Sequence, residues 1–184
     1  MEYNIHSNFE KAAKIFAHGC ETYAEPECCN RLAYMKAIGK GTAKNMDEAI
    51  PLAEQACAAK PSTCLSAALF NLSLKKFAKA SEYFQRACEE GSIAPACTRL
   101  ADMKLKGKAG DVTHHTGKEV LHLLDKACEM GDPPACINAS ALLAGKAKAL
   151  AEKAGIKEDQ KRSIKYRDRA VQLTQPAKGG SATT

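Results

Sequence analysis

The feature that most constrains the fold of this chain is a pair of cysteines that recurs along the sequence. Each pair has one cysteine followed by another seven to nine residues later. The pairs are Cys20 with Cys29, Cys57 with Cys64, Cys88 with Cys97, and Cys128 with Cys136, and Cys28 alone stands outside the pattern. A pair that returns in every unit indicates a structural repeat. The oxidation state of these cysteines also bears on the function of the protein.

The second cysteine of each pair sets the period of the repeat. These cysteines lie 35, 33 and 39 residues apart, and each is followed by small and apolar residues at helical spacing. A period of about 30 to 40 residues with this pattern is typical of solenoids built from helix pairs. We therefore predict an all-α fold, a right-handed α-solenoid of antiparallel helix pairs of the tetratricopeptide-like type, with disulfides between the helices.

Turn signals separate the helices that we expect. Gly39 and Gly41 end the first helix of the first complete unit, and Asp47 opens the second. Pro51 is expected in the first turn of this second helix, where its missing N–H is harmless. Further helices are expected around residues 9–20, 78–88, 97–107 and 159–173, with a long turn at residues 107–117.

The chain divides into three parts by composition. We assign residues 1–8 to an N-terminal extension, residues 9–174 to the helical repeats, and residues 175–184, which are small and polar, to a disordered tail. Small residues let helices approach closely, and a few aromatic side chains are expected to fill the gaps in the core. These are Phe16, Tyr34, Phe70, Phe77 and Phe84.

Charge and hydropathy argue against two classes of partner. The chain has 27 basic and 21 acidic side chains and no Trp, which is too little positive charge and too few rings to predict nucleic-acid binding. No apolar run reaches the ~20 residues of a transmembrane helix.

The first eight residues carry neither the basic nor the apolar region of a secretory signal. We expect a monomer without a transmembrane segment, whose partners are proteins.

Disulfides explain the cysteines better than a metal site does. No Cys-x-x-Cys occurs, and the pairs lack the close double spacing of structural zinc sites. We expect the first cysteine of each pair at the end of one helix and the second in the first turn of the next, within the ~4.4–6.8 Å between Cα atoms that a disulfide needs. Cys28 is then a free thiol, either an inert small residue or an exchange thiol that attacks the neighbouring Cys29.

The phrases around the cysteines resemble a known family. Residues 87–91 read Ala-Cys-Glu-Glu-Gly, residues 127–131 read Ala-Cys-Glu-Met-Gly, and residues 97–101 read Cys-Thr-Arg-Leu-Ala. On these phrases, residues 9–174 resemble Sel-one-like repeats in their disulfide-containing form. Within that family the chain is most similar to the cytochrome c oxidase assembly factor seven group of mitochondria. The resemblance implies a soluble α-solenoid of the intermembrane space that is needed for respiratory-chain assembly, with haem binding proposed for the group.

Other patterns suggest competing chemistry. His114, His115 and His122 are candidate haem ligands or else solvated histidines, and the Cys-x-x-Cys-His attachment motif is absent. Residues 73–76 match the Ser-x-x-Lys motif of β-lactamases, an activity ascribed to bacterial proteins with this repeat, but an α-solenoid lacks the sheet that this motif needs. The basic side chains between residues 146 and 169 form either a solvated cap or a binding site for anionic lipid or acidic protein.

The sequence thus predicts a non-enzymatic assembly or scaffold protein, with no catalytic or metal-binding residues and no assured cofactor. Disulfides without a secretory signal favour the mitochondrial intermembrane space, and a secreted or periplasmic location is the alternative. The expected role is cytochrome c oxidase assembly, through respiratory-chain assembly components bound on the concave face of the solenoid. The alternatives are a haem-binding or thiol–disulfide redox factor of the same compartment, and a cysteine-rich, β-lactamase-like repeat protein of the bacterial type.

Overall fold

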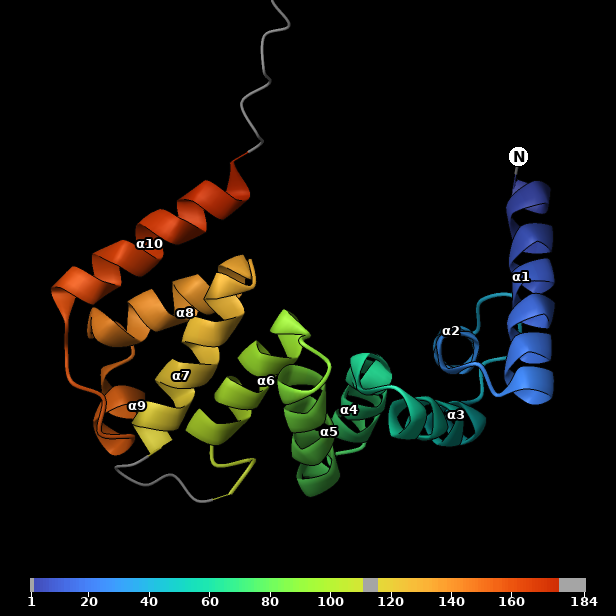
Figure 1. The fold of residues 1–184 in the computed structure, drawn as a ribbon, viewed down its shortest axis with the longest axis horizontal. Helices are drawn as coiled ribbons and strands as arrows, with labels where there is room; N and C mark the ends of the chain where they lie inside the picture. Colours follow the sequence, from blue (N-terminus) through green and yellow to red (C-terminus); the bar gives the residue numbers. More distant parts are fainter. Residues whose placement is uncertain (1, 111–115, 176–184) are drawn as a thin grey trace, which may run out of the picture. The chain divides into compact units, whose positions relative to one another are not determined.

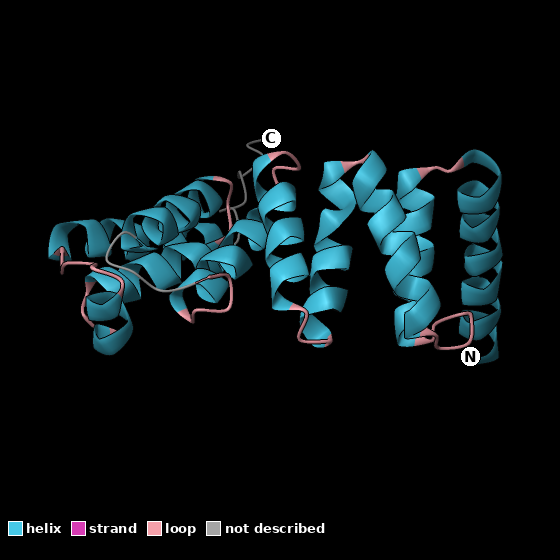
Figure 2. Cartoon of the chain, turned by 90° about the horizontal axis from the view of Figure 1, so that it is seen from below, coloured by secondary structure: helices cyan, strands magenta, loops and turns pink. Residues whose placement is uncertain are grey.

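The structure, a computed structural model, describes residues 2–110 and 116–175 of the 184-residue chain. Within these ranges every regular element is a helix and none is a strand (Figure 2). The all-α class predicted from the cysteine period is therefore confirmed. The chain divides into two compact units, residues 1–93 and residues 94–184. None of the described helices is both long and apolar enough to cross a membrane.

The first unit consists of two helix pairs preceded by a long helix (Figure 1). The bounds are α1 (Glu2–Tyr23), α2 (Pro26–Ile38), α3 (Met46–Ala59), the short 3₁₀ helix η1 (Pro61–Thr63), α4 (Cys64–Ser73) and α5 (Phe77–Glu89). α2 packs along α3, and α4 packs along α5. α1 lies against α2, and the turn between the two pairs contains η1. Each pair is the helix hairpin that the repeat pattern predicts.

The second unit continues the same scheme with one additional short helix. The bounds are α6 (Ala94–Leu105), α7 (Thr116–Glu129), α8 (Pro133–Leu143), α9 (Lys148–Lys153) and α10 (Gln160–Thr174). α6 packs along α7, and α8 packs along α10. α7 also contacts α8, and α10 contacts α7 as well as α8. The last helix of the unit is therefore held by both α7 and α8.

Side-chain caps fix where several helices begin and end. The Asn45 Oδ1 accepts a hydrogen bond from the Glu48 N–H at 3.2 Å, and the Asn45 Nδ2 donates to the Glu48 Oε1 at 2.7 Å. At α10, the Asp159 Oδ1 accepts from the Arg162 N–H at 3.0 Å. α2 is followed by its cap residue Gly39, whose φ of 74° lies in the left-handed region that glycine tolerates. Gly39 is the stop signal that the sequence indicates, and Asp159 lies where the sequence predicts the last helix to begin.

Three features of the helices differ from the expectation. α1 begins at Glu2, so residues 2–8 extend the first helix instead of preceding it. Because Asn45 caps α3, that helix begins at Met46 and Pro51 lies beyond its first turn, where it removes an intrahelical hydrogen bond; the predicted placement was wrong. The sequence did not indicate α9, because its six residues are mostly lysine and alanine with no apolar period.

Two predicted irregular segments are described only in part. The turn expected at residues 107–117 is shorter at its end, because α7 already begins at Thr116. Residues 111–115 of this turn lie outside the described residues. The same holds for residues 176–184 of the predicted tail, while Gln175 forms the C-cap of α10.

Small side chains make up much of the core in both units, as the alanine-rich pattern predicts. Among the aromatic residues, Phe70 and Phe84 are buried, and Phe16 and Phe77 are half-buried. Tyr34 is 55 % exposed, so its predicted place in the core was wrong. The buried residues of α2, including Cys29, Leu32, Ala33 and Ala37, share one face of the helix, and Tyr34 lies on the opposite face.

The loop between α2 and α3 approaches α1 closely at Gly41. This residue has a φ of 72°, and a Cβ atom added there would overlap the backbone carbonyl of Phe9. Glycine is required for two reasons, the left-handed backbone and the missing side chain. This contact seats the first helix pair on α1.

Candidate functional site

The structure joins cysteines across the turns between consecutive helices. The bonded pairs with described geometry are Cys20–Cys29, Cys57–Cys64 and Cys128–Cys136, whose Cα atoms lie 4.7, 4.3 and 4.9 Å apart. Cys88 in α5 and Cys97 in α6 are also disulfide-bonded. In each pair the first cysteine is in the last turn or two of its helix, and the second is in the first turn of the following helix. The spacing therefore placed these cysteines where the structure has them.

Cys28 is the free thiol, and it is half-buried between α1 and α2. It packs against the cluster that contains the Cys20–Cys29 disulfide, together with Phe16. Gly19 makes room for it, because a Cβ atom at that position would lie only 2.6 Å from the Cys28 Sγ. The close fit gives Cys28 a packing role in addition to any exchange chemistry.

The histidines that were considered as haem ligands do not form a described site. His114 and His115 lie outside the described residues. His122 is exposed on α7 and is not among the residues that line the groove between α7 and α10. No three His, Cys, Asp or Glu side chains in the described ranges come close enough together to hold a metal ion.

The Ser-x-x-Lys pattern falls at the end of a helix. The Ser73 hydroxyl donates to the Phe70 carbonyl at 2.7 Å in the last turn of α4. The following Leu74 and Lys75 form the turn before α5, and Lys75 has a φ of 58°. A β-lactamase serine needs a base and a neighbouring sheet. In the described part of the chain, Ser73 bonds to a backbone carbonyl of its own helix, and no strand is present.

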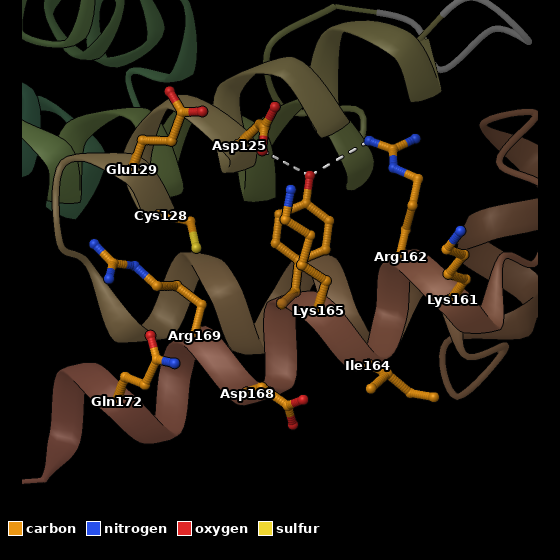
Figure 3. Close-up of a pocket in the computed structure, with 11 residues that line it drawn as sticks. Asp125, Cys128, Glu129, Lys161, Arg162, Ile164, Lys165, Asp168, Arg169 and Gln172 are labelled. Carbon is orange, nitrogen blue, oxygen red and sulfur yellow. Dashed lines mark hydrogen bonds between the residues drawn. The ribbon is translucent and has the colours of Figure 1, made fainter.

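The second unit has a groove formed by α7 and α10 (Figure 3). Its volume is about 650 Å³. The α7 side contributes Asp125, Cys128 and Glu129. The α10 side contributes Lys161, Arg162, Ile164, Lys165, Tyr166, Asp168, Arg169 and Gln172. We refer to these residues together as the α7–α10 groove.

Two connections to α8 hold the walls of the groove. The Cys128–Cys136 disulfide ties the end of α7 to the first turn of α8. On the other side, the buried Ser163 of α10 donates through its hydroxyl to the backbone carbonyl of Ser140 in α8, at 3.0 Å. Both walls are therefore fixed to one helix, so the groove is a preformed feature of the second unit.

A hydrogen-bonded chain crosses the groove at one end, where it links α10 directly to α7. The Arg162 Nη2 donates to the Tyr166 hydroxyl at 3.4 Å, and that hydroxyl donates to the Asp125 Oδ1 at 2.8 Å (Figure 3). Tyr166 is only 8 % exposed. Burial, with the bond to Asp125, raises the pKa of Tyr166 above its ordinary value of 10.0. The bond to Tyr166 in turn raises the pKa of Arg162.

A row of cations follows the α10 wall. Lys161, Lys165 and Arg169 recur every fourth residue, and all three are exposed. Within residues 2–110 and 116–175, no carboxylate oxygen lies within 4.0 Å of their nitrogen atoms. Asp168 pairs instead with Arg167 at 3.1 Å, and in Figure 3 it points away from α7. The groove thus has an unpaired basic row along one side.

Sequence reasoning identified the basic region but not the groove. Tyr166 and Asp125 are 41 residues apart in the chain, and no local pattern indicates that they meet. The fourfold spacing of Lys161, Lys165 and Arg169 was the available signal, because residues spaced by four lie on one side of a helix.

The repeat itself identifies the family. A sequence profile described as the Sel1 repeat matches residues 26–61, 66–92, 94–118 and 121–132, together more than half of the chain. The chain belongs to the Sel1 repeat family. In this Sel1 repeat protein the first two matched segments correspond to the helix pairs α2–α3 and α4–α5. The family expected from the cysteine phrases is confirmed.

Curated relatives of this Sel1 repeat protein have a common name. Cytochrome c oxidase assembly factor 7 of Xenopus tropicalis is 30% identical over 148 residues, which cover 74% of this chain and 63% of the relative. The protein of the same name from Homo sapiens is 29% identical over 119 residues, which cover 58% of this chain and 51% of the relative. The chain therefore spans between half and two thirds of the length of these relatives.

Solved structures support the fold of the Sel1 repeat protein. A Sel1 repeat protein from Oxalobacter formigenes superposes with a TM-score of 0.74 at 17% identity, covering 91% of this chain and 66% of the other. The Escherichia coli antigen c5321, described as having an SLR fold, gives a TM-score of 0.50 at 19% identity, covering 89% and 41%. At these identities the likeness concerns the fold alone. It confirms the helical-repeat solenoid predicted from the sequence.

Proposed function

We propose that this Sel1 repeat protein is a non-enzymatic scaffold that supports the assembly of cytochrome c oxidase through contacts with other proteins. The observation that carries this proposal is the match to relatives named cytochrome c oxidase assembly factor 7, at about 30% identity across the repeats. Stacked helix pairs present adjoining surfaces suited to binding other proteins. The residues reported above add no arrangement of base, nucleophile and oxyanion donors that would favour an enzyme.

The compartment belongs to the same proposal. We place the protein in the mitochondrial intermembrane space, where thiols can be oxidised after import. Support comes from the bonded cysteines, which are rare in reducing compartments, and from the name of the relatives. A secreted or periplasmic location is the alternative that also fits the disulfides. Submitochondrial fractionation with protease protection distinguishes these locations.

Complementation tests the proposed role. The full chain is expressed in cells that lack their own assembly factor 7, and assembled cytochrome c oxidase is measured by native electrophoresis and by oxygen consumption. We expect partial or full restoration. A protein that reaches the intermembrane space, keeps its disulfides and restores neither signal contradicts the proposal. Affinity capture from the restored cells then identifies the respiratory-chain assembly components that it binds.

Haem binding and thiol exchange stay predictions for the same compartment. For haem, the protein is titrated with haem and the shift of the Soret band is measured, in the wild type and in a variant with His114, His115 and His122 replaced together. If the Soret shift is the same in both proteins, these histidines are not the ligands. For exchange, the specific observation is Cys28 beside the Cys20–Cys29 disulfide. If Cys28→Ser leaves the rate of thiol–disulfide exchange unchanged, the redox alternative is wrong.

A further inference from the structure

Almost all of the net positive charge of this chain lies in one short stretch of the second unit. Residues 146–169 contain nine basic and four acidic side chains, a net charge of +5, while the whole chain carries +6. This stretch forms α9, the loop after it and most of α10. Four of its basic side chains line the α7–α10 groove, namely Lys161, Arg162, Lys165 and Arg169. Three acidic side chains, Asp125, Glu129 and Asp168, also line the groove, so its net positive charge is small and its basic side chains form a row on α10.

Three of these four cations have no described acidic partner. Arg162 is engaged by Tyr166, but Lys161, Lys165 and Arg169 have no carboxylate within 4.0 Å among the described residues. On a helix, residues four apart are separated by about 6 Å along the axis. The row therefore offers positive charges at a regular spacing of about 6 Å. A second helix with carboxylates every fourth residue has the same spacing.

We propose that the α7–α10 groove binds an acidic helical segment of a partner protein. This inference rests on the proposed function, because it names the kind of partner that the scaffold recognises. Carboxylates at positions i, i+4 and i+8 of the segment face Lys161, Lys165 and Arg169. Ile164 also lines the groove and is 47 % exposed, so it provides an apolar contact beside the charged row. Charge complementarity of this kind governs the rate and specificity of association.

The groove fits a protein segment better than it fits a nucleic acid or a membrane. Base binding uses exposed aromatic rings, and Tyr166, the aromatic side chain of the groove, is buried with its hydroxyl already bonded to Asp125. A membrane surface is flat, whereas the basic row runs along a groove of about 650 Å³ between two helices. A helix lying in a groove is a common mode of peptide recognition.

The α7 wall adds selectivity. Glu129 lies on this wall, is exposed, and has no ion-pair partner in the described part of the chain. It repels a ligand that is acidic on every side, and it favours one with carboxylates confined to the face towards α10. Glu129→Gln is therefore expected to tighten the binding of an acidic segment about twofold to threefold.

A synthetic peptide provides the direct test. The peptide is alanine-rich with three glutamates at i, i+4 and i+8, and its control has glutamines at the same positions. Binding to the full oxidised chain is measured by fluorescence anisotropy at low ionic strength, where the Debye length is about 30 Å at 0.01 M, and again near physiological salt, where it is about 8 Å. We expect the glutamate peptide to bind, the glutamine peptide to bind at least about tenfold more weakly, and the difference to shrink as salt rises.

Two triple variants separate the groove from net charge. The groove variant replaces Lys161, Lys165 and Arg169 with glutamine. The matched control replaces Lys146, Lys153 and Lys157 with glutamine, which removes the same charge from the same region outside the groove. We expect the groove variant to lose about tenfold in affinity and the control less than about threefold.

Several outcomes overturn the inference. These are equal losses in the two triple variants, equal binding of the two peptides, and tighter binding of duplex DNA or of phosphatidylserine–phosphatidylcholine vesicles than of the glutamate peptide. Complementation distinguishes failure here from failure of the proposed function. Restored cytochrome c oxidase assembly without groove-specific peptide binding overturns the groove inference alone. Groove-specific binding without restoration overturns the assembly role alone.

Discussion

At the scale of single residues, the hydroxyl of Tyr166 connects α10 to α7. Replacing Tyr166 with Phe removes its bond to Asp125 and the bond from Arg162 while keeping the buried ring. We expect the free energy of unfolding to fall by about 1 to 2 kcal/mol, because a hydrogen bond to a charged group is lost. Denaturant titration near neutral pH measures this difference. An unchanged midpoint contradicts the role given to the hydroxyl.

The raised pKa of Tyr166 also predicts how stability depends on pH. As pH rises above about 10, the tyrosine of the unfolded chain ionises before the folded one, so the unfolded state binds fewer protons. The contribution of Tyr166 is therefore fully present below pH 10 and is lost as pH rises through the higher folded pKa. Tyr83 behaves in the same direction, because burial and Glu54 raise its pKa. In the Tyr166→Phe protein, the free energy of unfolding should fall less above pH 10 than it does in the wild type. An identical fall in the two proteins contradicts the raised pKa of Tyr166.

Gly41 offers a second prediction, with a matched control. An alanine at Gly41 needs a left-handed backbone and also overlaps the carbonyl of Phe9 in α1. Gly110 has a φ of 105° too, but no atom of the described residues lies within 4 Å of an added Cβ atom there. We expect Gly41→Ala to cost at least about 1 kcal/mol more than Gly110→Ala. Hydrogen exchange should show the extra loss in α1, and equal costs would mean that the contact with Phe9 is unimportant.

At the scale of helices, the disulfides within each unit fix the junction between one helix and the next. Removing the Cys128–Cys136 bond by replacing both cysteines with serine releases the end of α7 from the first turn of α8. Closing a loop of this length stabilises a folded chain by about 2.5 kcal/mol in the chain-entropy account. We expect a loss of this order in the free energy of unfolding. Because Cys128 lines the α7–α10 groove, binding of the glutamate peptide should weaken as well.

The control for this prediction is Cys28→Ser, which removes a thiol but no bond. It should leave the unfolding free energy within about 1 kcal/mol of the wild type, since only local packing against Gly19 changes. Equal effects of the two replacements would show that loss of sulfur packing, and not loss of a bond, explains the change.

At the scale of the whole chain, the cysteine phrases and turn signals were sufficient to predict the fold class. The period of Cys29, Cys64, Cys97 and Cys136 predicted helix pairs, because a repeated local pattern produces a repeated local structure. The last helix was expected around residues 159–173, and the structure has α10 at Gln160–Thr174 with Asp159 as its cap. These features depend on residues that are close together in the chain, within one or two helical turns. They can therefore be predicted from the sequence alone.

Features that depend on distant residues were not predicted. The α7–α10 groove exists because Tyr166 meets Asp125 across 41 residues, and nothing near either residue indicates this contact. Tyr34 was misplaced for a related reason: its exposure depends on which face of α2 packs against the neighbouring helices. α9 was missed because its lysine-rich sequence resembles a solvated loop. Periodicity thus predicted the helices, and packing determined the site.

The central claim is that the cysteines form the framework of a protein-binding repeat, with Cys28 as the free thiol. The most direct measurement is alkylation of the native protein and then of the reduced and unfolded protein, with the labelled peptides mapped by mass spectrometry. We expect label on Cys28 alone in the first step, where partial burial slows it, and on the eight paired cysteines in the second, nine in all. Labelling of the paired cysteines in the native, oxidised protein would contradict the claim.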